Sequence, residues 1–154
     1  MIIAFDTALK TGWAYQNSSG AWRIGVVNPR RTLALNGVIA EARDTGCRLA
    51  AIEDCYLGHG NVHTLKVLQD CQTRIQCACE AHGLAVRLVP AQEWQSDLGL
   101  TGTREDRKYG AMRIARMLTG STKLTQDMAD AVCIADYMSR LPGEESIHAV
   151  CRCL

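Results

Sequence analysis

The sequence lacks any apolar run that approaches the roughly 18 residues needed for a membrane-spanning helix. It also lacks a signal-peptide pattern at its beginning, because the stretch from Met1 to Asp6 has no basic residues and an acid interrupts it. No internal repeat, low-complexity tract or linker is present. These absences favour one cytoplasmic domain. The motifs at residues 3–14, 51–53 and 127–131 place it over residues 1–140, with a tail of unassigned role over residues 141–154. Neither membrane contact nor a small-molecule cofactor is expected.

Eight cysteines are present, but no export signal accompanies them. Several fall inside predicted regular elements, so free and mostly buried thiols are favoured over disulfides, as at Cys55, Cys71 and Cys133. Two further pairs are separated by one residue, unlike the two to four residues of zinc fingers: Cys77 with Cys79, and Cys151 with Cys153. A structural zinc site, which would also draw on His59 and His63, is therefore the less favoured alternative.

The net charge is only +1, which is low for a protein that binds nucleic acid. This net value conceals a basic segment over residues 104–116, which contains five basic residues and two acidic ones. The basic residues are Arg104, Arg107, Lys108, Arg113 and Arg116, and the acidic ones are Glu105 and Asp106. Phosphate binding depends on local charge more than on the total. The segment is therefore a candidate phosphate-binding surface.

Apolar segments alternate with helical patterns along the chain, which predicts an α/β fold. Continuous or alternating apolar runs predict strands over residues 1–6, 12–16, 21–27, 49–52 and 85–89. Apolar residues at helical spacing predict helices over residues 33–42, 65–78, 103–118 and 125–140, and a glycine-containing loop is expected after Pro90. Three consecutive strands predict an antiparallel meander, and two later strand–helix–strand crossovers require parallel neighbours. We expect a mixed five-stranded sheet flanked by helices.

Four acidic residues lie at positions that such a sheet would bring into one crevice. Asp6 ends the first predicted strand and Glu53 ends the fourth, whereas Asp127 and Asp130 lie three residues apart on the last helix. Taken singly, each acid is more typical of a solvated strand end or of a helix start. Together in one crevice they would repel one another unless a divalent cation were bound. Two ions about 4 Å apart can activate water and stabilise the leaving oxygen of a phosphodiester.

Three motifs resemble those of RuvC-like Holliday-junction resolvases in the ribonuclease H-like superfamily, especially bacteriophage forms. They are the opening strand and Thr-Gly-aromatic turn over Ile3–Ala14, the segment Ala51-Ile52-Glu53, and Asp127-Met128-Ala129-Asp130-Ala131. Their order and spacing match across residues 1–140. The resemblance implies a homodimeric endonuclease, in the host cytoplasm if phage-encoded, that cuts two strands of a four-way DNA junction symmetrically. It implies Mg²⁺, with Mn²⁺ able to substitute, bound by Asp6, Glu53, Asp127 and Asp130.

The resemblance also implies contacts with branched DNA. Tyr56 matches an aromatic position that the family uses against unpaired bases, and a strand-end aromatic covering the core is the equally weighted alternative. Lys66 falls at the start of the family's long helix, near the dimer interface and the DNA. Lys108 matches a catalytic basic position near the scissile phosphate, although a solvated helix face is its alternative. Arg107 and Arg113 are weaker candidates.

The chain departs from the family pattern at two points, and other functions remain open. Cellular enzymes commonly carry Asp-Pro-Gly where this chain has Asp6-Thr7-Ala8, and a second family lysine falls on or near Trp94. The first alternative is another nuclease of this fold acting on flaps, RNA–DNA hybrids or structured RNA. An actin-like ATPase would need a second Asp-Gly phosphate loop, which the sequence lacks. A non-catalytic Cys/His module is the third alternative.

Overall fold

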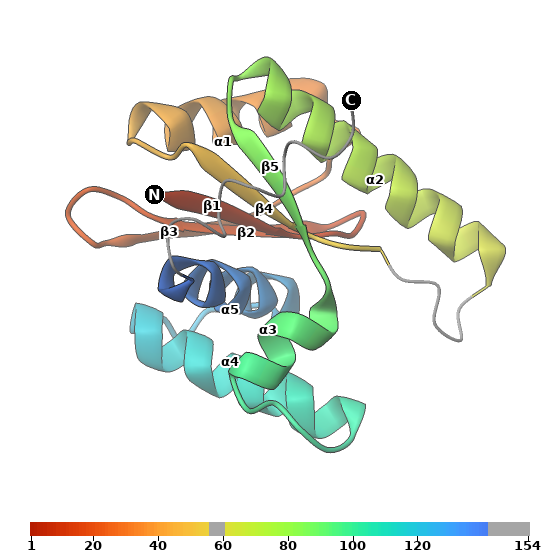
Figure 1. Cartoon of the computed structure of the whole chain (residues 1–154), viewed down its shortest axis with the longest axis vertical. Helices are drawn as coiled ribbons and strands as arrows, with labels where there is room; N and C mark the ends of the chain where they lie inside the picture. Colours follow the sequence, from red (N-terminus) through yellow and green to blue (C-terminus); the bar gives the residue numbers. More distant parts are fainter. Residues whose placement is uncertain (56–60, 142–154) are drawn as a thin grey trace.

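The computed structural model describes residues 1–55 and 61–141, which form a mixed five-stranded sheet with helices on both faces (Figure 1). The strand order is β3-β2-β1-β4-β5. Adjacent strands are antiparallel from β3 to β1 and parallel from β1 to β5. The strands are β1 (Ile2–Asp6), β2 (Thr11–Gln16), β3 (Trp22–Val27), β4 (Leu49–Glu53) and β5 (Ala85–Val89). The predicted meander and its parallel neighbours are confirmed.

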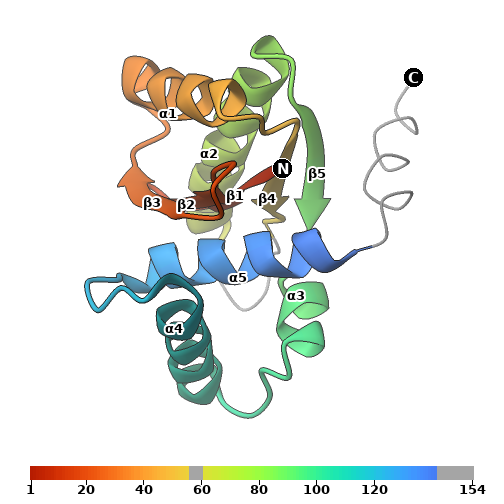
Figure 2. The same ribbon diagram turned by 90° about the vertical axis from the view of Figure 1, so that its left-hand side faces the viewer.

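The helices divide into two groups, one on each face of the sheet. Figure 2 shows α1 (Thr32–Asp44) and α2 (Val62–Ala81) on one side and α5 (Gln126–Arg140) crossing the other. The helix α4 (Arg104–Thr119) lies beyond α5, and α3 (Ala91–Asp97) follows directly after β5. Among the described helices, none combines the length and apolar character that crossing a bilayer requires.

Side-chain size on the two faces of the sheet explains this arrangement. Ile3 and Phe5 point into the core beneath α1 and α2, whereas Ala4 and Ala51 point toward α5. Small side chains on that face allow α5 to lie close to the sheet. At Gly12 of β2 an added Cβ would overlap the backbone carbonyl of Asp127, so the first turn of α5 can dock only against glycine.

Polar caps determine where the last two long helices begin. The Thr103 hydroxyl accepts a hydrogen bond from the Asp106 amide at 3.2 Å, and the Asp106 carboxylate accepts one from the Thr103 amide at 2.9 Å. This reciprocal capping box starts α4 at the position where the sequence predicted a helix to begin. The Thr125 hydroxyl accepts from the Met128 amide at 3.3 Å and starts α5. The cap thereby places Asp127 in the first turn of that helix.

The prediction of a loop after Pro90 is wrong over α3. A seven-residue helix is too short to show a helical apolar stripe, so its sequence gives little periodic signal. Its one fully buried side chain is Trp94, which is 2% exposed and packs into the core beside Val89 and Leu100. Burial of the Trp94 indole against other elements therefore stabilises a helix that the local sequence does not predict.

The described cysteines are free thiols and most of them are buried, as predicted. Cys71 and Cys133 lie in the core, and burial raises the pKa of Cys79 to about 12. A buried thiol with so high a pKa is a poor nucleophile. His59, Cys151 and Cys153 lie outside the described residues, as does all of the predicted tail except Leu141.

Candidate active site

The structure brings the four predicted acids into one cavity of about 400 Å³. Asp6 and Glu53 come from the carboxyl ends of β1 and β4, which are adjacent parallel strands with Phe5 paired to Ile52. Asp127 and Asp130 reach the same cavity from α5 on the sheet face opposite α1 and α2. Residues far apart in the chain thus meet because strand ends and a helix start converge.

Burial and mutual repulsion raise the pKa of three of the acids, Asp6, Glu53 and Asp130. Burial raises the pKa of Asp6 well above its usual value, and the neighbouring Glu53 charge and a hydrogen bond between the two carboxyl groups raise it further. Burial likewise raises the pKa of Glu53, and it raises that of Asp130 to about 7, with smaller upward effects from the Glu53 and Asp127 charges. Without a cation, the cluster must therefore hold protons near neutral pH.

The donor set suits a hard divalent cation, because all four groups offer carboxylate oxygens and Mg²⁺ or Mn²⁺ prefers oxygen ligands. Across residues 1–55 and 61–141, however, no three acidic, histidine or cysteine side chains already surround one ion position. Two of the carboxylates are held instead by neutral donors. Gln126 donates to Asp130 at 2.8 Å, and Trp94 donates to Glu53 at 3.2 Å. Each of these hydrogen bonds engages one oxygen of its carboxylate and leaves the second oxygen for an ion.

The cavity also has a basic wall, which α4 forms. The first turns of α4 contribute the three cationic side chains that line the cavity, which are Arg104, Arg107 and Lys108. The Lys108 charge is close enough to lower the pKa of Asp130 slightly, against the larger effect of burial. Arg107 also donates to the Gly102 carbonyl at 2.7 Å, which anchors its guanidinium. A phosphodiester inside this cavity would meet these cations as well as the carboxylate oxygens.

The other predicted DNA contacts lie outside this cavity. Arg113 lines a neighbouring hollow with Tyr109, on a different side of α4 from Lys108. Lys66 is exposed near the beginning of α2 and does not line the cavity. Tyr56 lies outside the described residues. The structure therefore brings Arg107 and Lys108, but not Arg113 or Lys66, to the acids.

Sequence reasoning missed several residues that support the site. Thr7 replaces the proline of the cellular pattern, and its hydroxyl donates to the Glu53 carbonyl at 3.0 Å, tying the end of β1 to that of β4. Gln126 precedes Asp130 by one helical turn, a spacing that could have revealed their contact. Trp94 on α3 gave no local signal, because its partner Glu53 belongs to β4, which is distant in the sequence.

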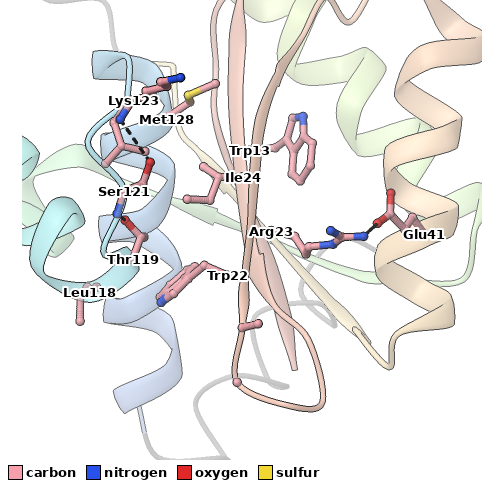
Figure 3. Close-up of a pocket in the computed structure, with 13 residues that line it drawn as sticks. Trp13, Trp22, Arg23, Ile24, Glu41, Leu118, Thr119, Ser121, Lys123 and Met128 are labelled. Atoms are coloured by element: carbon pink, nitrogen blue, oxygen red, sulfur yellow. Dashed lines mark hydrogen bonds and ion pairs between the residues drawn. The ribbon is translucent and has the colours of Figure 1, made fainter.

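A larger cavity of about 750 Å³ lies at the edge strand β3, away from the acids (Figure 3). Figure 3 shows Trp22 and Ile24 on one side of the strand and Trp13 and Arg23 on the other. Among its described lining residues one is a carboxylate, Glu41, which forms an ion pair with Arg23 at 3.0 Å. The described part of this hollow therefore offers no acid cluster for a divalent cation, although its volume is the larger of the two.

Comparison with solved structures places this arrangement in a known fold. The chain matches Thermus thermophilus RuvC in complex with a Holliday junction substrate, with a TM-score of 0.62 and 14% identity over 90% of this chain and 92% of that one. The structure of Thermus thermophilus RuvC alone gives a TM-score of 0.60 with the same identity and coverage. No family model and no curated protein matches the sequence. The chain therefore has the RuvC-like form of the ribonuclease H-like fold.

Proposed function

We propose that this chain is a metal-dependent endonuclease that resolves four-way DNA junctions by paired, symmetric phosphodiester hydrolysis. The observation that carries the proposal is the single cavity in which four carboxylates from three elements face three cationic side chains of α4. The fold supports it, because the matched Thermus thermophilus RuvC was solved with a Holliday junction substrate. We further propose residues 1–140 as the nuclease domain and the cytoplasm as its location.

The site residues divide into those that bind cations and those that bind DNA. Mg²⁺, or Mn²⁺ in its place, would be held by Asp6, Glu53, Asp127 and Asp130. When bound, the ions supply a more acidic water and neutralise charge on the phosphate and leaving oxygen. The α4 side chains Lys108, Arg107 and Arg104 orient the phosphodiester by binding its non-bridging oxygens. Lys108 would stabilise charge that develops there, because its own charge is near enough to Asp130 to act on that carboxyl group.

Symmetric cleavage requires two active sites, and each chain supplies one such cavity within the described residues. We therefore propose a homodimer that places the two cavities on matching strands of the junction. Outside the cavity, Lys66 on α2 and Arg113 on α4 are exposed and would contact the phosphates of the junction arms. Tyr56 would cover an unpaired base near the crossover.

Cleavage of defined substrates tests the proposal. Purified protein with Mg²⁺ is offered a mobile four-way junction, a flap, a linear duplex and an RNA–DNA hybrid. We expect paired nicks at symmetric positions in the junction and little cleavage of the other three. Asp6→Asn and Glu53→Gln should each abolish cleavage while junction binding persists, because they remove a cation ligand and leave the basic wall intact. Glu41→Gln, at the other cavity, is the matched control and should cleave normally. Cleavage by either site variant, or preference for the hybrid, would contradict the proposal.

A further inference from the structure

Trp94 connects the hydrophobic core to the acidic cavity. Its side chain is 2% exposed and packs in a cluster with Ala51, Val89 and Leu100. The indole N–H nevertheless reaches the cavity, where it donates to Oε1 of Glu53 at 3.2 Å. An indole offers one donor and no acceptor, so a buried tryptophan needs such a partner.

The backbone positions of both residues, Glu53 and Trp94, fix this contact. Glu53 ends β4 and is paired in parallel register with Val89, the last residue of β5. Pro90 follows as the N-cap of α3, with φ −59° and ψ 136°, and one turn later Trp94 lies over the end of β4. Because both partners leave neighbouring strands within a few residues, the indole has little freedom to move away from the carboxylate.

The contact restricts Glu53 without cancelling its charge. With Oε1 accepting from the indole, rotation of the carboxylate is limited and its remaining lone pairs are left for the cavity and Asp6. A neutral donor restricts the carboxylate without competing electrostatically with a cation for it.

We propose that Trp94 is a positioning residue whose indole N–H orients the Glu53 carboxylate for divalent-cation binding. The proposal rests on the proposed function, since it assigns Glu53 to the cation. Trp94 is almost fully buried and acts through its hydrogen bond to Glu53. Loss of the N–H should weaken cation binding about 10- to 100-fold, the range typical of groups that hold a metal ligand in place.

Calorimetric titration of DNA-free protein with Mg²⁺ tests this with Trp94→Phe, which keeps an aromatic ring and removes the donor. We expect about 10-fold or greater loss of Mg²⁺ affinity, with junction binding in chelator unchanged. Cleavage should fall at limiting Mg²⁺ and recover at saturating Mg²⁺. Tyr137→Phe is the matched control, because it removes a buried hydroxyl that donates to Glu93 at 3.3 Å in the same core cluster. Its Mg²⁺ affinity should equal that of the wild type.

The indole signal in a ¹H–¹⁵N spectrum provides a readout independent of cleavage. The Trp94 signal, identified by its loss in Trp94→Phe, should move when Glu53→Leu removes the acceptor and again when Mg²⁺ binds the wild type. If Trp94→Phe fails to fold, the signal is identified by elimination with Trp13→Phe and Trp22→Phe. Unchanged Mg²⁺ affinity in Trp94→Phe, or a signal unaffected by Glu53→Leu, would overturn the assignment. Failure of the wild type to cut junctions, with the affinity loss still present, would instead count against the proposed function alone.

Discussion

Removing one acid from the site should make the metal-free protein more stable, although it removes a cation ligand. The perturbation is Asp130→Asn, which preserves the size of the side chain and an oxygen that can accept from Gln126. Burial, together with the Glu53 and Asp127 charges, raises the pKa of Asp130 to about 7 from its ordinary value of 3.8. The folded chain therefore holds this proton more tightly than the unfolded chain does.

The magnitude follows from the linkage between protonation and folding. Because the folded pKa is the higher one, ionisation of Asp130 lowers the stability of the folded state as pH rises from about 4 to about 7. Above that range the full penalty is about 4 kcal/mol. Side-chain rearrangement and water entry reduce it, so we expect Asp130→Asn to gain about 2 kcal/mol at pH 8. For a domain of this size that gain corresponds to about 4–8 °C in Tm.

Thermal unfolding in chelator at pH 8 and pH 4 measures the effect. The gain in Tm should be present at pH 8 and nearly absent at pH 4, where the carboxyl is protonated in the folded chain and partly so in the unfolded one. With added Mg²⁺ the wild type should have the higher Tm of the two proteins, because only the wild type keeps all four carboxylate ligands. Asp136→Asn is the matched control on the same helix. Asp136 forms an ion pair with Arg140 at 3.3 Å, so its loss should give no gain. An equal gain at both pH values, or none at pH 8, would refute the electrostatic reasoning.

Two further predictions concern the placement of α5 and the basic wall. Gly12→Ala should destabilise the fold by about 2 kcal/mol or more and weaken Mg²⁺ binding, because the added methyl group would displace the Asp127 backbone. Thermal unfolding measures the loss of stability, and calorimetric titration measures the loss of Mg²⁺ affinity. Gly37→Ala, where an added Cβ meets nothing within 4 Å, is its control, and equal losses in both would contradict this account. Lys108→Ala should slow cleavage and reduce the slope of log affinity against log salt by about one. If rate and slope were both unchanged, Lys108 would not contact phosphate.

Local sequence determined the elements and the chemistry of the acids. Alternating and helical apolar patterns depend on which side chains share a face. Strands such as Ala85–Val89 and helix starts near Thr103 and Thr125 were therefore predictable from neighbouring residues. The acids at the ends of β1 and β4 were also visible, because a polar residue ends each apolar run. The mixed sheet followed, because the two strand–helix–strand crossovers require parallel neighbouring strands.

Only the tertiary structure decided how closely these parts approach one another. The contact between Gly12 and the Asp127 backbone depends on the volume left between β2 and α5, and no local pattern encodes that volume. The short helix α3 and the Trp94–Glu53 hydrogen bond likewise exist because separate segments bury one indole together. Periodicity reports which way a side chain points along its own element, whereas the separation between elements depends on the packing of both.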